Sequence, residues 1–374
     1  MTNSLFDSAR YQAVRKPLLQ ASTLPPECYT SPEFFRREVG RIFLQNWQFV
    51  GREEQVAAPG DYFCFDGLGG SVIVVRGLDM RLKAYANSCR HRGSRLLDGS
   101  GECKRIVCPY HGWSYRLDGS LVGTPGMQRV ENFDPRDYPL IELPLETWAG
   151  FIFIHYADSP PPLSQHLGSM VDRFASHRPA QMRHVGSLEF DIDANWKLLA
   201  ENALEAYHTG TVHRATLGQQ DSSVVDTTGS WTALLVEDEA SVATLPGDDK
   251  PFPHIDGLDT EARAGACFTL VFPSTQLVFA QDCLWWLAFS PVAVDRTRLT
   301  LGACFPQSTI CLPGFEDKLK SYFERWRLAT AEDNAICEAQ QQGQKCAREA
   351  GRFAPDEFAV HALANWVLDQ VLER

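Results

Sequence analysis

Residues 89–111 read CRHRGSRLLDGSGECKRIVCPYH, and this stretch decides how the first half of the chain is interpreted. It contains Cys89-x-His91 and, after sixteen further residues, Cys108-x-x-His111. Each half supplies one thiol and one imidazole, so two loops that meet would close one metal site. Thiolate and imidazole are the ligands that soft and borderline metals prefer. The pattern therefore predicts a metal centre built from two loops.

Three interpretations of these four residues compete. A structural zinc would take all four ligands as one tetrahedron. A [2Fe–2S] cluster with two histidine ligands would place both cysteines on one iron and both histidines on the other. The plain alternative is that these residues are two ordinary buried thiols and two ordinary histidines. Four ligand-type residues in this order within 23 positions argue against that alternative. Cys103 lies off the pattern, and we expect it to be a small apolar residue.

The loops around these ligands resemble the Rieske ferredoxin motif. Both pairs lie in loops that carry Gly, Arg and Pro between short β-rich runs, whereas zinc fingers usually place their histidines on a helix. Residues 108–113, CPYHGW, and the spacing of the two pairs meet the Rieske pattern in full. The resemblance implies a [2Fe–2S] cluster whose ligands are Cys89, His91, Cys108 and His111.

A second group of ligand-type side chains lies in residues 195–213, NWKLLAENALEAYHTGTVH. The pattern predicts a helix up to about residue 208, with Glu205 and His208 at i, i+3 on one face. The Thr-Gly-Thr run that follows is expected to end or kink the helix, so that His213 reaches back from the next turn. Two converging imidazoles are half of a 2-His-1-carboxylate site, which binds Fe(II) and leaves positions open for O2. By itself such a pair is more often an ordinary surface or core pair.

The neighbouring residues resemble the helix that opens the mononuclear iron site of Rieske oxygenases. The resemblance rests on NWK at 195–197, EN at 201–202 and ExYH at 205–208. It implies that His208 and His213 are iron ligands, with Asn202 beside them in a supporting position.

The third iron ligand is expected to be a carboxylate from far downstream. Residues 331–344, AEDNAICEAQQQGQ, read as a helix and resemble the segment of the carnitine- and betaine-oxidising members that carries an Asp ligand. Asp333 is the candidate that this resemblance selects. Glu332 and Glu338 are its rivals, and a solvated helix carboxylate is the plain alternative.

Glu205 has a different expected role. In this family an acidic residue at its position bridges a cluster histidine of one subunit to an iron-ligand histidine of the next, fixing both tautomers. The resemblance implies a head-to-tail ring, a homotrimer, in which the cluster of one chain serves the iron of its neighbour. A carboxylate that merely supports the site or lies at the surface is the alternative.

The resemblance covers nearly the whole chain and implies an α+β fold. An all-β Rieske domain is expected at 45–157, followed at 158–374 by a helix-grip (START-like) catalytic domain with a curved antiparallel sheet flanked by helices. An N-terminal helical segment, 1–44, would pack on the catalytic domain. Three consecutive prolines at 160–162 independently indicate a domain boundary, because proline breaks both helix and sheet.

Residue patterns predict the main elements. Helical spacing after a Ser31 cap predicts a helix over 31–47, and the chain beyond residue 314 reads as mostly helical. Runs rich in Val, Phe, Leu, Thr and Trp predict antiparallel strands at 231–244, 267–273, 275–292 and 296–306.

Composition excludes several classes of protein. The 374 residues carry 47 acidic and 35 basic side chains, a net charge of -12, which argues against a nucleic-acid binder. The longest apolar stretches are too short to span a bilayer, and the first residues lack the pattern of a signal peptide. Eleven irregularly spaced cysteines do not form a secreted disulfide scaffold, so we expect a cytoplasmic protein.

The source of electrons is expected to be a separate protein. Residues 67–72, GLGGSV, fail the nucleotide-binding fingerprint because Val72 occupies the position of the last glycine. NAD(P)H would therefore act only indirectly, through a flavin/iron–sulfur reductase or a ferredoxin. A basic rim around the cluster would steer such a partner, and a solvated loop explains the charges equally well. The rim consists of Arg81, Lys83, Arg90, Arg92, Arg95, Lys104 and Arg105, against Asp98 and Glu102.

The expected function is that of a Rieske-type non-haem iron oxygenase, using O2 to hydroxylate or N-demethylate a small quaternary-ammonium compound of the betaine or carnitine kind. A ring-hydroxylating oxygenase acting on an aromatic acid is the alternative enzyme. A Rieske electron carrier or a zinc-stabilised binding protein is the non-enzymatic alternative. Seven aromatic side chains could form a cage for the ammonium group, the flat apolar slot of a ring hydroxylase, or plain hydrophobic core. These are Trp231, Phe268, Phe272, Phe279, Trp285, Trp286 and Phe289.

Overall fold

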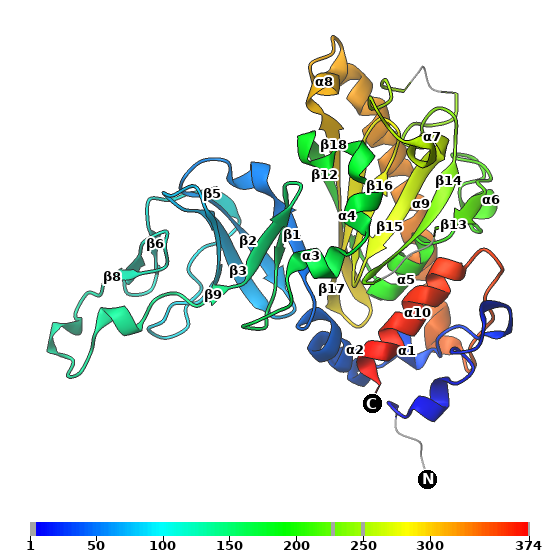
Figure 1. Cartoon of the computed structure of the whole chain (residues 1–374). Helices are drawn as coiled ribbons and strands as arrows, with labels where there is room; N and C mark the ends of the chain where they lie inside the picture. The colour runs from blue at the N-terminus through cyan, green and yellow to red at the C-terminus, as the bar shows by residue number, and fades with distance from the viewer. Residues whose placement is uncertain (1–4, 226–228, 248–250, 373–374) are drawn as a thin grey trace. The chain divides into compact units, whose positions relative to one another are not determined.

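The computed structural model describes residues 5–225, 229–247 and 251–372, and it divides the chain into two compact units (Figure 1). One unit is the β-rich segment Phe43–Leu163. The other combines Met1–Ile42 with Ser164–Arg374. The second break follows directly on the three prolines at 160–162, which cannot donate backbone hydrogen bonds to either neighbouring element.

The β-rich unit consists of three small antiparallel sheets. A three-stranded sheet has the order β1 (Gln48–Arg52), β11 (Phe151–Ile154), β10 (Leu145–Trp148). A five-stranded sheet has the order β5 (Ser100–Glu102), β2 (Asp61–Gly67), β3 (Gly70–Arg76), β4 (Leu82–Ala86), β9 (Glu142–Leu143). The third sheet has the order β6 (Ile106–Val107), β7 (Ser114–Tyr115), β8 (Leu121–Gly123). Connections between these short strands leave long loops, and two of them carry the Cys and His pairs.

A seven-stranded antiparallel sheet organises the larger unit. Its order is β12 (Met182–Ile192), β18 (Arg296–Pro306), β17 (Leu284–Ala293), β16 (Thr275–Phe279), β15 (Gly265–Val271), β14 (Trp231–Glu237), β13 (Ser222–Val224). The predicted α+β class and antiparallel sheet are thus confirmed. The strand predicted over 275–292 is wrong as one element, because a tight turn between Ala280 and Cys283 divides it into β16 and β17. The 11-residue strand β12 was not predicted, since its sequence is polar and only its ends are fully buried.

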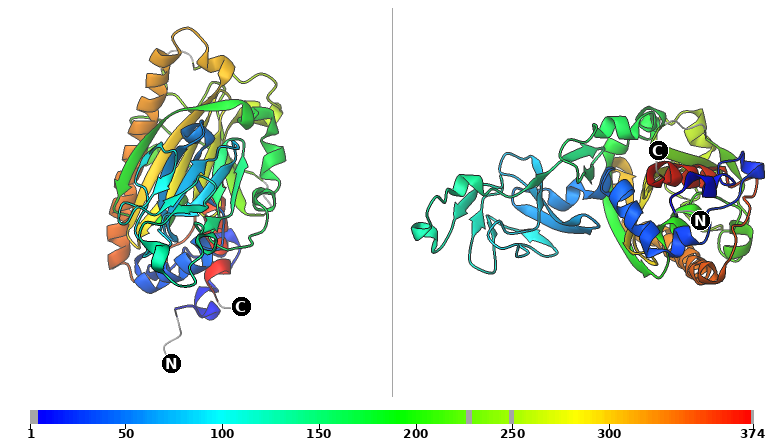
Figure 2. Two further views of the ribbon diagram at one scale, coloured as in Figure 1. Left: turned by 90° about the vertical axis from the view of Figure 1, so that its left-hand side faces the viewer. Right: turned by 90° about the horizontal axis from the view of Figure 1, so that it is seen from below.

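Helices surround this sheet, and the longest of them covers one face (Figures 1 and 2). Aromatic side chains of α9, such as Tyr322 and Trp326, form one buried cluster with Val278 of β16 and Trp285 of β17. Phe174 stacks on Phe279 at the opposite face of β16, because neighbouring residues of a strand point to opposite sides. The helices are α1 (Glu27–Thr30), α2 (Pro32–Glu38), α3 (Leu163–Leu167), α4 (Met170–Arg173), α5 (Trp196–Asn202), α6 (Thr209–Val212), α7 (Thr260–Ala264), α8 (Gln307–Ile310), α9 (Phe315–Cys346) and α10 (Phe358–Val371). Among the described residues, no helix has the length and apolar character that crossing a membrane requires.

Two predicted helices differ from the observed ones. Ser31 caps α2 as expected, accepting hydrogen bonds from two backbone N–H groups, but the α-helix ends at Glu38 and continues as a π-helical turn, Val39–Phe43. The helix predicted up to residue 208 ends at Asn202. Glu205 lies in the irregular segment beyond it, where its carboxylate accepts the N–H of His208 at 2.9 Å and so starts the short helix α6. The Thr-Gly-Thr run at 209–211, which was expected to end a helix, therefore forms part of the new helix α6.

A buried ion pair joins the start of α5 to α2. Lys197 Nζ lies 2.7 Å from Glu38 Oε1, and both side chains are 0% exposed. Asn195, the N-cap of α5, accepts a second hydrogen bond from the same ammonium group at 2.8 Å. Burial raises the pKa of the Glu38 carboxyl above its usual value, and the Lys197 ammonium offsets only part of this rise. The pair thus holds α5 against α2. Removing either partner would leave the other as an uncompensated buried group.

Replacing Lys197 with Met should destabilise this unit by about 3–5 kcal/mol, because Glu38 would be left as an uncompensated buried carboxyl. The measurement is the thermal unfolding midpoint by circular dichroism. Lys320→Met is the matched control, since Lys320 pairs with Asp317 at the solvent-exposed surface of α9. The control should leave the midpoint unchanged. An unchanged midpoint for Lys197→Met would show that the buried pair does not hold α5 in place.

Candidate metal centres

Two loops of the β-rich unit share one backbone pattern around their cysteines. In each loop the cysteine N–H donates to the carbonyl five residues later, at 2.8 Å for both Cys89 and Cys108. The cysteine carbonyl in turn accepts from a glycine four residues later, at 2.9 Å for Gly93 and 3.1 Å for Gly112. Both glycines have positive φ, +74° and +71°, which a residue with a Cβ adopts only with strain. The two pairs are therefore presented by matching loops.

The four predicted ligands separate into a thiol pair and an imidazole pair. Nδ1 of His91 lies 3.2 Å from Nδ1 of His111, and the ring of His91 stacks on Trp113. Cys89 and Cys108 are 3% and 2% exposed, whereas both histidines are half-buried. The Tyr115 hydroxyl lies 3.4 Å from Cys89 Sγ. The histidines thus lie on the solvent side of the thiols.

This separation fits a two-iron cluster and not a single zinc ion. The ligand atoms of one tetrahedral zinc, bonded at about 2.0–2.3 Å, would all lie within about 4 Å of one another. Among the described residues, the three ligand atoms that lie within 4.8 Å of one another belong to His208, His213 and Asp333, and not to the Cys and His pairs of these loops. Sulfur ligands on one iron and nitrogen ligands on another need no such convergence.

The sulfur of Cys108 is prepared to be a thiolate. Burial raises the pKa of this thiol, but the backbone N–H groups of Tyr110 and His111 outweigh it, so the pKa lies below its usual value. Burial raises the pKa of Cys89, although Tyr115 and the N–H of His91 oppose the rise. Backbone N–H groups directed at sulfur stabilise the anionic form that a metal cluster requires.

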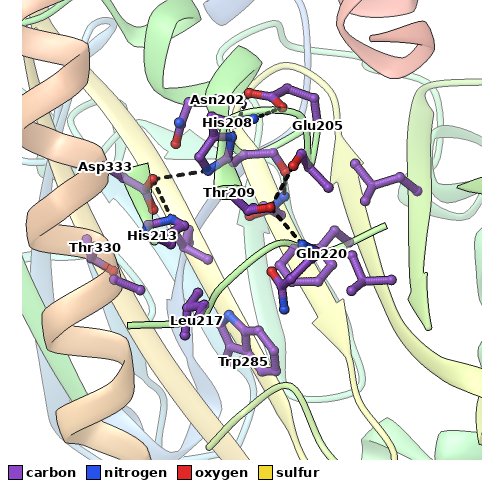
Figure 3. Close-up of a pocket in the computed structure, with 18 of the residues that line it drawn as sticks. Asn202, Glu205, His208, Thr209, His213, Leu217, Gln220, Trp285, Thr330 and Asp333 are labelled. Atoms are coloured by element: carbon purple, nitrogen blue, oxygen red, sulfur yellow. Dashed lines mark hydrogen bonds and ion pairs between the residues drawn. The ribbon is translucent and has the colours of Figure 1, made fainter. Parts of the chain in front are cut away.

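The second candidate centre lies in the larger unit, where α6 faces α9 (Figure 3). Asp333 Oδ1 lies 3.4 Å from Nε2 of His208 and 3.0 Å from Nε2 of His213. The two histidines flank α6, directly before Thr209 and directly after Val212. The three ligand atoms lie within 4.8 Å of one another, close enough to hold one metal ion. The structure therefore brings together the three residues predicted as iron ligands.

A carboxylate holds each of these histidines by its other ring nitrogen. Nδ1 of His208 lies 2.6 Å from Glu205 Oε1, and Nδ1 of His213 lies 2.7 Å from Glu332 Oε2. A carboxylate accepts hydrogen bonds, so Nδ1 of each ring carries a proton and Nε2 is the nitrogen that faces the centre. Glu332, considered above as a rival ligand, instead orients His213, and it also accepts a hydrogen bond from Thr216. The sequence carried no signal for this role, because 119 residues separate the partners.

The Asp333 carboxylate is suited to a cation. Its Oδ1 is buried and faces the Nε2 atoms of both histidines. Burial raises the pKa of this carboxyl, but the two facing imidazoles outweigh it and lower the pKa to about 2. Burial lowers the pKa of His208, but the carboxylates of Asp333 and Glu205 raise it to about 9. A divalent cation would replace the protons that these pKa values hold at the site.

A cavity of about 80 Å³ adjoins this trio between α9 and the sheet. Leu234, Phe268, Trp285 and Leu301 supply its apolar wall, and Asn202 also lines it. Arg325, for which the sequence carried no signal, lines the same cavity.

Of the seven aromatic residues considered for substrate contact, only Phe268 and Trp285 line this cavity. Trp285 and Trp286 are neighbours in β17 and point to opposite faces of the sheet. Phe272 stacks instead on Trp366 of α10. Of the seven, two rings on one wall of the cavity therefore remain as candidates for substrate contact.

The three carboxylates of this segment of α9 should have different effects on iron binding. Asp333→Ala should abolish tight binding of Fe(II), and Glu332→Ala should weaken it by about 10- to 100-fold, because His213 loses its orienting partner. Glu338→Ala is the control, since this side chain accepts the backbone N–H of Asp193 and is not one of the three converging ligand residues. Anaerobic titration with Fe(II), followed by metal analysis after desalting, measures the difference. Loss of iron in the Glu338 variant alone would transfer the ligand role to that residue.

Comparisons with known protein families agree with both centres. The model described as Ring hydroxylating alpha subunit (catalytic domain) matches residues 179–373. The model described as Rieske [2Fe-2S] domain matches residues 46–134.

Two proteins similar in sequence to this chain are named as monooxygenases or their oxygenase subunits. The carnitine monooxygenase oxygenase subunit of Acinetobacter pittii (strain PHEA-2) is 34% identical over 220 residues, which are 57% of this chain and 58% of that protein. The chain thus matches little more than half the length of this relative. The chloroplastic choline monooxygenase of Spinacia oleracea is 27% identical over 373 residues, covering 96% of this chain and 80% of that protein.

A solved structure shows the same fold. The quaternary ammonium Rieske monooxygenase CntA, in complex with an inhibitor, superposes with a TM-score of 0.80 at 26% sequence identity. The superposition covers 96% of this chain and 98% of that one.

Proposed function

Because this chain belongs to the family of ring-hydroxylating alpha subunits and carries a Rieske [2Fe–2S] domain, we propose that it is the oxygenase component of a multi-component monooxygenase. It would use O2 to hydroxylate or N-demethylate a small quaternary-ammonium compound. The convergence of two imidazole nitrogens and one carboxylate oxygen beside a cavity carries this proposal. This is the ligand set of non-haem Fe(II) oxygenases.

The proposed cluster ligands are Cys89, His91, Cys108 and His111, and the proposed iron ligands are His208, His213 and Asp333. When bound, the cluster supplies single electrons and the iron activates O2. Glu205 and Glu332 accept the Nδ1–H of the two iron-binding histidines and keep their Nε2 atoms directed at the centre. The apolar wall of the cavity excludes water, which protects a reactive centre from side reactions.

The substrate class rests on the relatives and on the cavity wall. Relatives are named for carnitine and choline oxidation. In this chain Phe268 and Trp285 meet edge to face, with ring centroids 5.7 Å apart, and both rings border the cavity. Aromatic faces attract quaternary ammonium groups through their quadrupoles.

An electron-donating partner would dock near the cluster loops. Arg90, Arg92, Lys104 and Arg105 are exposed and have no ion pair with any described residue. Three other members of the predicted basic rim, Arg81, Lys83 and Arg95, pair with carboxylates of this chain. The four unpaired cations would steer an acidic ferredoxin or a flavin/iron–sulfur reductase, which would draw on NAD(P)H.

Exposed aromatic side chains beside both centres support a homotrimer. Tyr110 precedes His111 and is 57% exposed, and Tyr207 precedes His208 and is 65% exposed. Large exposed aromatic rings are typical of surfaces that a partner covers. A head-to-tail ring would cover both and would let Glu205 serve as the bridge between a cluster histidine of one subunit and His208 of the next. A reducing cytoplasm fits the eleven cysteines, none of which forms a disulfide in the described part of the chain.

The test of this function is the His213→Ala variant. Substrate oxidation, measured as formaldehyde or hydroxylated product with a compatible reductase, should be lost because the iron loses a ligand. The visible absorption and the EPR signal of the reduced cluster should remain, since His213 and the cluster loops lie in different units. His254→Ala is the control, because this exposed histidine lies outside the proposed site and bonds to the carbonyl of Ala240. Turnover that survives in His213→Ala would refute the iron site, and a pure electron carrier would then be favoured.

A further inference from the structure

Arg325 is a buried cation on the wall of the proposed active-site cavity. It lies on α9, eight residues before Asp333, and is only 6% exposed. Eight residues of α-helix rise about 12 Å, so Arg325 lies about two turns away from the proposed iron ligand along the same helix. Ala329 and Thr330, between them, line the same cavity.

The guanidinium of Arg325 forms no direct ion pair with a carboxylate within the described part of the chain. Its Nε is buried without a hydrogen-bond partner. The contact found for its charge is the ring of Trp285, whose centroid lies 5.8 Å from Cζ. Arg52 shows how the chain treats a buried arginine elsewhere. That side chain is paired with Glu54 at 2.8 Å and with the carbonyl of Ala149 at 2.7 Å.

An unpaired buried cation is costly, so a ligand that supplies the missing anion would bind there with a large gain. Burial lowers the pKa of Arg325 to about 10, and the side chain therefore remains charged at neutral pH. The nearby Asp333 carboxylate is committed to the two histidines, so it does not provide the missing partner. A planar guanidinium is the group best matched to a carboxylate, because two parallel N–H groups meet two oxygens.

We propose that Arg325 binds the carboxylate of the substrate and selects quaternary-ammonium acids over the corresponding alcohols. This inference rests on the proposed function and adds a specificity-determining residue to it. The carboxylate lies at the Arg325 end of the cavity, the apolar wall contacts the methylated nitrogen, and the carbon to be oxidised faces the trio.

The charges around the cavity support a zwitterionic substrate. With a divalent metal ion bound at the trio, the charges of Glu205, Glu332, Asp333, Arg325 and the ion would sum to zero, although none of these carboxylates pairs directly with Arg325. A betaine-type compound carries one positive and one negative charge, so it leaves this balance unchanged. An alcohol such as choline adds an uncompensated positive charge near Arg325, which like-charge repulsion disfavours.

Two matched ligand pairs test the inference by binding to the iron-loaded enzyme. Glycine betaine is compared with choline, and benzoate with benzyl alcohol, by isothermal titration calorimetry under anaerobic conditions. The carboxylate of each pair should bind at least about tenfold more tightly than the alcohol. Arg325→Gln should remove this preference by weakening the carboxylates about 10- to 100-fold and leaving the alcohols unchanged. Arg325→Lys should restore part of it.

Arg327→Gln is the matched control, because Arg327 is exposed on the same helix and paired with Glu324. Its ligand preference should equal that of the unchanged protein. Cluster absorption and circular dichroism check that each variant is folded, and the unchanged protein alone already tests the preference if Arg325→Gln fails to fold.

The outcomes separate this inference from the proposed function. Equal affinity for acid and alcohol, or a preference that survives in Arg325→Gln, overturns the role of Arg325 while quaternary-ammonium oxidation stands. Preference within the benzoate pair, without binding of glycine betaine or choline, supports Arg325 and overturns the quaternary-ammonium substrate. Absence of binding by all four ligands overturns both.

Discussion

The start of α5 and the second half of α9 are held in register by a hydrogen bond that a buried asparagine donates to a buried glutamine. The Asn195 N–H donates to Gln341 Oε1 at 2.9 Å, and the Asn195 amide donates to the carbonyl of Val294 at 2.6 Å. Both side chains are 0% exposed, so these bonds form where water cannot replace them. The segment that carries His208 and His213 follows α5, while Asp333 lies eight residues before Gln341. The convergence of the three ligand atoms depends on this register.

The carboxylates around the iron site divide the work between binding and orientation. Asp333 directs one oxygen at the Nε2 atoms of both histidines, whereas Glu205 and Glu332 each bind the Nδ1 side of one imidazole. Because both histidines then present Nε2, the site accepts a cation with no change of tautomer. Glu205 also begins α6 by accepting the His208 N–H. One side chain therefore sets both the backbone turn and the ring orientation of a ligand.

The helix predicted from periodicity was too long because a local hydrogen bond to a side chain redirects the backbone. The apolar pattern through residue 208 predicts a continuous helix, but the bond from the His208 N–H to Glu205 redirects the chain after Asn202. The strand β12 escaped prediction for a related reason. It is partly exposed along its length and pairs with β18 over ten residue positions, so backbone pairing, and not an apolar sequence, maintains it.

Local sequence patterns were sufficient to predict two Cys/His pairs at Rieske spacing, a histidine pair, a downstream aspartate and an antiparallel β-rich fold. Those signals are local, because ligand spacing and residue periodicity are carried by neighbours in the chain. The folded chain was needed to see that Glu332 orients His213, that two of seven aromatic residues border the cavity, and that Arg325 lines it without an ion-pair partner among the described residues. These facts depend on contacts between residues far apart in sequence and on which face of a strand or helix is buried, and no local pattern encodes either.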